Sequence, residues 1–174
     1  MDRAVDEVEI VRVTPRNVSS LIELIVELAR FEGLEPPTEE AQERLRSHLT
    51  ASPPLFHSFL ALVDGGPVGY ITYYFTYSTF LAAPTLFLED IFVREDDRRS
   101  GVGSALFRHC MGEALEKGCG RMEWCVLDWN VKAMDFYRAQ GGREMDWTFF
   151  RMDREDMMRS LGRPAGRTIG ERVV

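Results

Sequence analysis

The feature that most constrains this 174-residue chain is an apolar run followed by a glycine-containing loop and a helical pattern. The run LFLEDIFV covers residues 86–93, and the loop RRSGVGS covers residues 98–104. Glycine has no Cβ and accepts positive φ, so the loop backbone can approach an anion closely. Free N–H groups at a helix start favour negative charge, and a nearby arginine adds charge-assisted donors. The order of apolar run, glycine loop and helix therefore predicts a pyrophosphate-binding site. Taken alone, the loop could instead be a tight turn that precedes a helix.

Hydrophobic periodicity predicts that strands and helices alternate along most of the chain. The expected strands are residues 8–13, 56–63, 68–77, 86–93, 121–127 and 147–152. The expected helices start at residue 17 or 19, 38, 103 and 131, and end near residues 33, 49, 117 and 140. This order predicts an α/β fold with a mixed sheet flanked by helices. We expect one domain over residues 1–158 and a solvated tail over residues 159–174.

Charge and composition narrow the classes of partner. The formal net charge of −7 disfavours nucleic acid and anionic membranes and favours a cationic substrate. No apolar run approaches the roughly 20 residues that span a bilayer. The three cysteines lack metal-binding or redox spacing, the three histidines have no partner at metal-ligand spacing, and the N-terminal residues lack a signal-peptide pattern. We therefore expect a cytoplasmic protein without a bound metal.

Several further segments carry a family resemblance. They are ELARFE at residues 27–32, YYFTY at residues 73–77, LEDI at residues 88–91, VLDWN at residues 126–130 and AMD at residues 133–135. Together with the Arg-x-x-Gly-x-Gly loop, they resemble the Gcn5-related N-acetyltransferase (GNAT) superfamily. Within it, the chain most resembles the spermidine/spermine and thialysine N-acetyltransferase group. The resemblance covers roughly residues 8–153 and implies a GNAT fold with a central splayed sheet.

The resemblance implies that acetyl-CoA is the cosubstrate and assigns its contacts. The pyrophosphate is assigned to the loop, and the pantetheine arm pairs with the end of the strand as an additional strand, where a backbone N–H polarises the thioester carbonyl. The assigned contacts are Ile91, Phe92, Val93, Arg98, Arg99, Ser100, Gly101, Val102, Gly103, Ser104, Asn130, Ala133 and Tyr137. From the residues alone, Asn130 equally fits a helix N-cap, a role compatible with cofactor contact.

Two residues are assigned to catalysis by the resemblance. Tyr137 matches the tyrosine that protonates the departing thiolate, although an aromatic residue on an amphipathic helix is more often part of a core. Glu89 matches the acid that binds the amine and acts as general base, directly or through water. Glu89 and Asp90 are adjacent in a strand, so we expect their side chains to point to opposite faces and only one to enter a given cleft. Pairing with an arginine is the alternative for either acid.

Phe31, Glu32, Glu89 and Ser78 are the expected substrate contacts, and a solvated acid at a helix end is the alternative for Glu32. Ser78 stands where spermine-type relatives carry an acid, so the chain resembles the thialysine branch more. The expected substrate is therefore the primary amine of a thialysine- or lysine-like amino acid, a diamine or a polyamine. A protein N-terminal or lysine acetyltransferase and a catalytically silent acyl-CoA-binding module are the alternatives. A homodimer is expected because relatives commonly form one.

Overall fold

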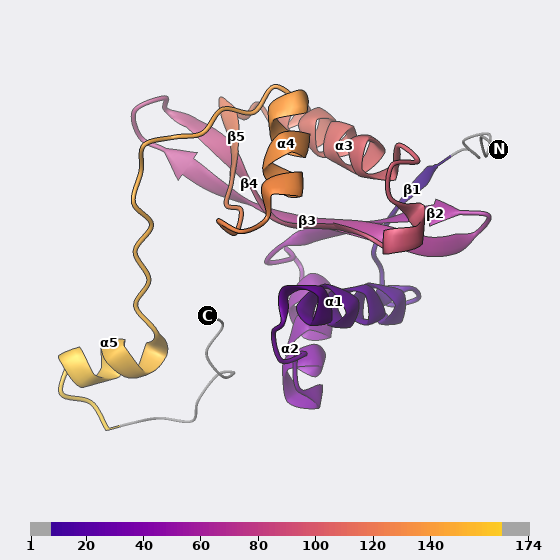
Figure 1. Cartoon of the computed structure of the whole chain (residues 1–174). Helices are drawn as coiled ribbons and strands as arrows, with labels where there is room; N and C mark the ends of the chain where they lie inside the picture. Colours follow the sequence, from indigo (N-terminus) through magenta and orange to yellow (C-terminus); the bar gives the residue numbers. More distant parts are fainter. Residues whose placement is uncertain (1–7, 165–174) are drawn as a thin grey trace.

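Five strands form one sheet in the order β1-β2-β3-β4-β5, and the computed structural model describes residues 8–164 (Figure 1). The strands are β1 Glu9–Arg12, β2 His57–Val63, β3 Gly66–Ser78, β4 Ala83–Val93 and β5 Arg121–Trp124. The first four pair antiparallel, whereas β4 and β5 pair parallel. The sheet is therefore mixed, as the sequence predicts.

Helices cover both faces of the sheet (Figure 1). The helices of the described residues are α1 Val18–Glu32, α2 Glu39–Leu49, α3 Val102–Glu116, α4 Val131–Ala139 and α5 Arg154–Ser160, with a 3-10 turn η1 at Glu95–Asp97. Helices α1 and α2 lie on one face of the sheet, α3 and α4 lie on the other, and α5 stands apart from it (Figure 1). α3 buries Leu106, Phe107 and Cys110 in one core, where they cluster with the sheet residues Ile71 and Leu88. α1 buries Leu21 and Leu24 in a second core on the other face, together with Tyr70 and Phe92.

Local signals explain some of the helix ends and the hairpin turn. The Thr38 hydroxyl accepts the Ala41 N–H at 3.3 Å and caps α2, whereas Gly33 ends α1 with a φ of 72°. Asn17 precedes α1, but its side chain accepts the Thr14 N–H at 2.7 Å instead of capping the helix. Asp64 and Gly65 both have positive φ in the two-residue turn between β2 and β3, which is the geometry that hairpins favour.

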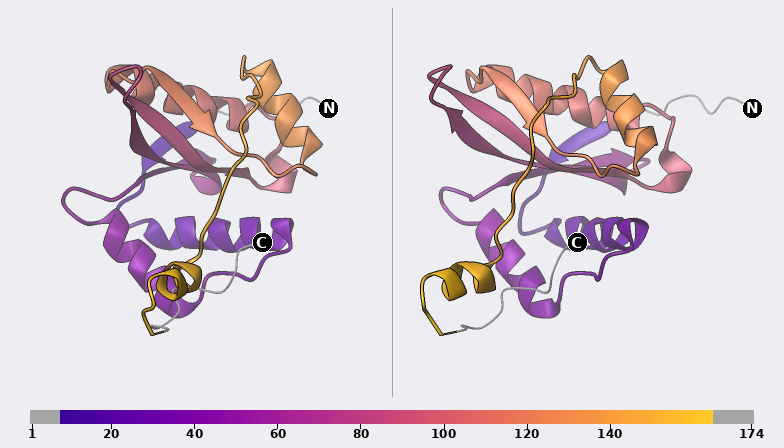
Figure 2. Two further views of the ribbon diagram at one scale, coloured as in Figure 1. Left: turned by 90° about the vertical axis from the view of Figure 1, so that its left-hand side faces the viewer. Right: turned by 60° about the vertical axis from the view of Figure 1, so that its left-hand side comes forward.

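The C-terminal part departs from the expectation. The strand predicted at Trp147–Met152 is wrong: residues 142–153 contain no helix or strand, and residues 143–155 are exposed. This segment leaves the body of the protein after α4 and runs to α5 (Figure 2). A strand requires a neighbouring strand, and the segment has none within residues 8–164. The boundary expected between residues 158 and 159 falls inside α5, and residues 165–174 of the predicted tail lie outside the described residues.

Candidate active site

A β-bulge in β4 places two acids on one face of the sheet. Thr72 pairs with Asp90 and Tyr73 pairs with Leu88, so Glu89 is an extra residue without a cross-strand partner. Leu88 and Ile91 both pack toward the α3 core, which leaves Glu89 and Asp90 on the opposite face. The expectation that the two acids point to opposite faces is therefore wrong. Strict strand alternation fails at this point because the bulge inserts one residue.

Both acids line a pocket of about 400 Å³ between the sheet and the helices α1 and α2. Helices α1 and α2 and the segment before β2 form its apolar side, and strands β3 and β4 form its polar side. Its lining residues are Ile25, Leu45, Leu55, Phe56, Thr72, Tyr74, Glu89 and Asp90. A pocket with apolar walls and two carboxylates suits a small organic cation, because the walls contact its carbon chain and the acids bind its charge.

The two acids have different surroundings. The Glu89 side chain is exposed, whereas Asp90 is partly covered. Burial, and to a smaller extent the charges of Glu89 and Glu32, raise the pKa of Asp90 to about 7, and the nearby Tyr70 hydroxyl partly opposes this rise. Burial also raises the pKa of Glu32. This cluster of acids favours the binding of a cation.

Among the described residues, no strand pairs with the β5-facing edge of β4 beyond Leu88. β5 pairs with β4 through Leu88 and Trp124 and then ends, while β4 continues to Val93. The Arg94 N–H donates to Val68 of β3 at 2.9 Å. Since hydrogen-bonding direction alternates along an antiparallel strand, the backbone groups of Ile91 and Val93 point to the open edge and those of Phe92 point to β3. The open edge can therefore accept an extended ligand as an additional strand.

The loop after β4 has the geometry of an anion site. Gly101 has a φ of 91°, and a Cβ added there would meet no atom within 4 Å. No side chain caps the start of α3 and no acid lies in its first turn, so the N–H groups at this end keep their capacity to bind an anion. Arg99 also has a positive φ of 64°, which curls the loop. These residues fit the pyrophosphate of a CoA ester.

The Arg98 side chain spans the end of β4 and α1. Its Nε donates to the Val93 carbonyl at 2.9 Å, and its guanidinium lies 4.7 Å from the centre of the Phe31 ring. Phe31 in turn lies 5.9 Å from Trp129, measured between ring centres. These contacts link Phe31 to the loop, while Phe31 and Glu32 are not among the residues that line the pocket.

Tyr137 lies on α4 beside the end of β5. Its ring centre lies 5.2 Å from that of Trp124 and 5.9 Å from that of Phe107, so the ring packs in the aromatic core, and its role in catalysis stays a prediction. Burial raises the pKa of Tyr137 to about 12, and the charges of Asp90 and Glu32 contribute. The charges of these two acids therefore act on Tyr137, although it lies on the α3 side of the sheet and does not line the pocket.

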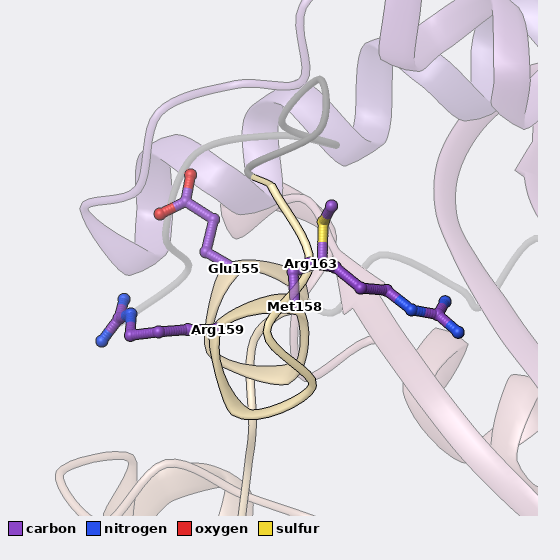
Figure 3. Close-up of a pocket in the computed structure, with 4 residues that line it drawn as sticks. All are labelled: Glu155, Met158, Arg159 and Arg163. Atoms are coloured by element: carbon purple, nitrogen blue, oxygen red, sulfur yellow. The ribbon is translucent and has the colours of Figure 1, made fainter.

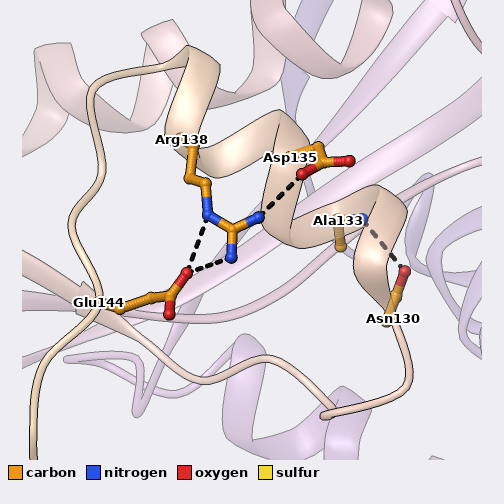
Figure 4. A network of polar contacts seen from close by, with 5 residues as sticks. All are labelled: Asn130, Ala133, Asp135, Arg138 and Glu144. Atoms are coloured by element: carbon orange, nitrogen blue, oxygen red, sulfur yellow. Dashed lines mark hydrogen bonds and ion pairs between the residues drawn. The ribbon is translucent and has the colours of Figure 1, made fainter.

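Hydrogen bonds fix α4 at both ends (Figure 4). The Asn130 side chain accepts the Ala133 N–H at 3.2 Å, which confirms the capping role. Arg138 binds Asp135 at 2.8 Å and also binds Glu144, which lies in the segment after the helix. The caps and the ion pairs orient the helix that carries Tyr137.

Ser78 lies on the same face as Thr72 and Tyr74 but further along β3, opposite Ala83. Its hydroxyl accepts the Leu81 N–H at 3.3 Å, and the side chain is buried. Ser78 does not line the pocket, so contact with substrate stays a prediction. The sequence reasoning missed the pocket residues Thr72 and Tyr74. Their alternation with Tyr73 could have placed them on one face, but nothing in the sequence marks them as pocket residues.

A second concavity lies far from these residues. Its lining is formed by Glu155, Met158, Arg159 and Arg163, whose side chains extend from α5 and its C-terminal end (Figure 3). Within residues 8–164, no group of three or more His, Cys, Asp or Glu side chains could hold a metal ion. None of the helices in these residues has the length and apolarity needed to cross a bilayer.

Comparison with known proteins gives the family. The Acetyltransferase (GNAT) family matches residues 20–141. A thialysine N-epsilon-acetyltransferase of Bos taurus is 35% identical over 156 residues, which cover 83% of this chain and 91% of the relative. An L-ornithine N5-acetyltransferase, NATA1, of Arabidopsis thaliana is 39% identical over 85 residues, covering 48% of this chain and 37% of that protein.

The solved structures share the fold. An aminoglycoside N-acetyltransferase, AAC(6′)-Iy, in complex with CoA superimposes with a TM-score of 0.73 at 22% identity, covering 88% of this chain and 99% of that one. The mixed sheet, the open edge of β4 and the glycine loop before α3 agree with the family match. The chain is a member of the GNAT family of acetyl-CoA-dependent N-acetyltransferases.

Proposed function

We propose that this acetyltransferase acetylates the primary amine of a small molecule, a thialysine- or lysine-like amino acid or a short diamine. The observation that carries the proposal is the pocket in which Glu89 and Asp90 meet, directly where β5 ends and β4 becomes open. The names of the relatives, a thialysine and an ornithine acetyltransferase, support amino acids that carry a side-chain amine.

Each step of direct transfer has a group in the described residues. Acetyl-CoA supplies the activated acyl carbon when bound. The loop from Arg99 to Ser104 would hold its pyrophosphate, and a backbone N–H on the open edge, at Ile91 or Val93, would polarise the acyl carbonyl. The acids would bind the ammonium and remove a proton, and Tyr137 would protonate the departing sulfur.

The pocket favours a short substrate. Ile25 and Leu45 provide an apolar wall for methylene groups, and the acids bind one charged end. Ser78 stands further along the same face, with a hydroxyl in place of a charge. A hydroxyl can hydrogen-bond the carboxylate of an amino acid, whereas a second ammonium of a long polyamine lacks a charged partner there. We therefore expect amino acids and short diamines to be better substrates than spermine.

An amine panel tests this proposal. Thiol release from acetyl-CoA is measured with thialysine, lysine, ornithine, putrescine and spermine, for wild type and for Ser78→Asp. The expected result is a higher kcat/KM for the amino acids in wild type and a relative gain for spermine in the variant. The substrate assignment is wrong if wild type prefers spermine. It is also wrong if Ser78→Asp leaves the ratio of kcat/KM for spermine to kcat/KM for the amino acids unchanged.

Two alternatives have distinct outcomes in the same assays. A protein acetyltransferase would leave the small amines unmodified and acetylate peptide N-termini or lysines. A silent acyl-CoA-binding module would bind acetyl-CoA in calorimetry and release no thiol with any amine. The two acids together in one pocket favour a small cationic amine over a peptide.

We also expect a homodimer. Large apolar side chains are exposed in the segment after α4, including Trp147 at 78% and Phe150 at 88% exposure. The outer edge of β5 has no partner strand within residues 8–164. A second copy could cover both surfaces, since exposed edges and apolar segments favour association.

Light scattering after gel filtration should give twice the chain mass. The double variant Trp147→Glu, Phe150→Glu should give a lower mass. A monomeric wild type would contradict the expected homodimer. The cytoplasmic location also stays a prediction.

A further inference from the structure

The bulge in β4 brings two neighbouring carboxylates into one pocket with unequal exposure. We infer that Asp90, rather than Glu89, is the base that takes the proton from the substrate ammonium, and that Glu89 binds the ammonium as a counter-charge. The inference rests on the proposed function, because it assigns roles within the same pocket. It reverses the assignment that family resemblance alone implies.

The position of Asp90 separates it from Glu89. Asp90 keeps a cross-strand partner, Thr72, whereas Glu89 is the unpaired bulge residue with an exposed side chain. The Thr72 hydroxyl is already engaged with the Ser58 hydroxyl at 3.0 Å. Asp90 thus keeps its place in the ladder of the sheet, while Glu89 is exposed at the bulge, where its charge acts on Tyr74 and, after burial, raises the pKa of that phenol.

Tyr70 is the polar neighbour of Asp90. Its hydroxyl is buried and makes no hydrogen bond of standard geometry within the described residues. Asp90 nevertheless influences it, since burial and then the Asp90 charge raise the pKa of Tyr70. A phenol can donate to a carboxylate and accept from a carboxylic acid. Tyr70 can therefore support Asp90 before and after it takes a proton, while a buried hydroxyl left without a partner would be unfavourable.

The charged and titratable groups around Asp90 make it an effective base near neutral pH. They come from four elements: Glu89 on β4, Glu32 on α1, Tyr70 on β3 and Tyr137 on α4. Burial and the two glutamates raise the pKa of Asp90 to about 7. An ordinary aspartate has a pKa of about 3.9 and is a weak base, whereas a group whose pKa lies near the working pH accepts a proton readily, while about half of it is still ionised.

The proton balance closes with these groups. The ammonium gives one proton to the Asp90 carboxylate, and the freed nitrogen lone pair forms the C–N bond with the acyl carbon. The C–S bond breaks, its electron pair goes to sulfur, and sulfur takes the phenol proton of Tyr137. The nitrogen then loses its second proton, which restores Tyr137, and Asp90 returns its proton to water. The products are the amide, the free thiol and one proton.

The test compares two isosteric variants, Asp90→Asn and Glu89→Gln, with lysine or thialysine as substrate. In wild type, kcat/KM should rise with pH through a step near pH 7, as Asp90 loses its proton. Asp90→Asn should lower kcat by about 10²-fold or more and abolish this step. Glu89→Gln should mainly raise the KM for the amine and keep the step, moved to lower pH because the Glu89 charge no longer raises the pKa of Asp90. Acetyl-CoA binding measured by calorimetry should be retained in both variants, which shows that they are folded.

A second measurement does not depend on turnover. The carboxyl carbons of aspartate are labelled with ¹³C, and the resonance lost in Asp90→Asn is titrated in the free wild-type protein. A midpoint near 7 supports the assignment, and a midpoint near the ordinary aspartate value overturns it. Loss of the pH step in Glu89→Gln but not in Asp90→Asn also overturns it. A wild type that acetylates no amine would refute the proposed function, and the titration would still decide whether Asp90 is poised as a base.

Discussion

Replacement of Asp90 by asparagine should change stability in a pH-dependent way. The ordinary pKa of the group is 3.8, and its pKa in the folded protein is about 7. Below the ordinary value both the folded and the unfolded chain carry the proton, so the group has no effect. Between the two values the folded chain keeps a proton that the unfolded chain has lost, so the free energy of unfolding falls as pH rises. Above about pH 7 the loss is complete.

The pKa shift sets an upper limit on the magnitude. A rise of about three units, at 1.36 kcal/mol each, corresponds to at most roughly 4 kcal/mol. Asparagine keeps the shape of aspartate and carries no charge, so the free energy of unfolding does not fall with pH in the variant. Its amide group presents a different donor and acceptor to the Tyr70 hydroxyl. We therefore expect Asp90→Asn to unfold with about 1 to 3 kcal/mol more free energy than wild type at pH 8, and with little difference near pH 4.

Urea unfolding followed by tryptophan fluorescence, at one-unit steps from pH 4 to pH 8, measures this difference. Glu43→Gln is the control, because Glu43 is 77% exposed on α2 and far less buried than Asp90. The reasoning would be refuted by a stability difference for Asp90→Asn that is independent of pH or that grows as pH falls. Such an outcome would also show that the pKa of Asp90 is not raised in the folded protein.

Three further variants test other parts of the site. Gly101→Glu places a side chain and a negative charge in the loop, so calorimetry should show strongly weakened acetyl-CoA binding; binding as tight as in wild type would contradict the loop assignment. Tyr137→Phe should lower kcat by about 10²- to 10⁴-fold, provided that chemistry limits the rate, and leave acetyl-CoA binding unchanged. Gly69→Ala would put its Cβ 2.6 Å from the Phe92 carbonyl oxygen, so it should destabilise the β3–β4 pair by roughly 1 to 3 kcal/mol in urea unfolding; wild-type stability would show that the strands separate easily.

Local signals in the sequence determined much of the architecture. The glycine loop after an apolar run predicted the junction of β4 and α3, and Gly101 indeed has positive φ there. Thr38 caps its helix and the Asp64-Gly65 turn forms the hairpin, because both depend on residues close together in the chain. Asn130 likewise caps α4. Such features need few distant contacts, so residue type and spacing are sufficient to predict them.

The tertiary structure decided the side on which the two acids lie and the fate of the last predicted strand. Alternation separates Glu89 from Asp90, yet the bulge brings both to one pocket, because the pairing of β4 with β3 skips one residue. Trp147–Met152 has the apolar content of a strand but pairs with no other strand within the described residues. The sequence defines which residues favour extended structure, whereas register and pairing depend on contacts between segments far apart in the chain. For that reason the sequence shows that β4 carries two adjacent acids, but it could not show the burial that makes Asp90 differ from Glu89.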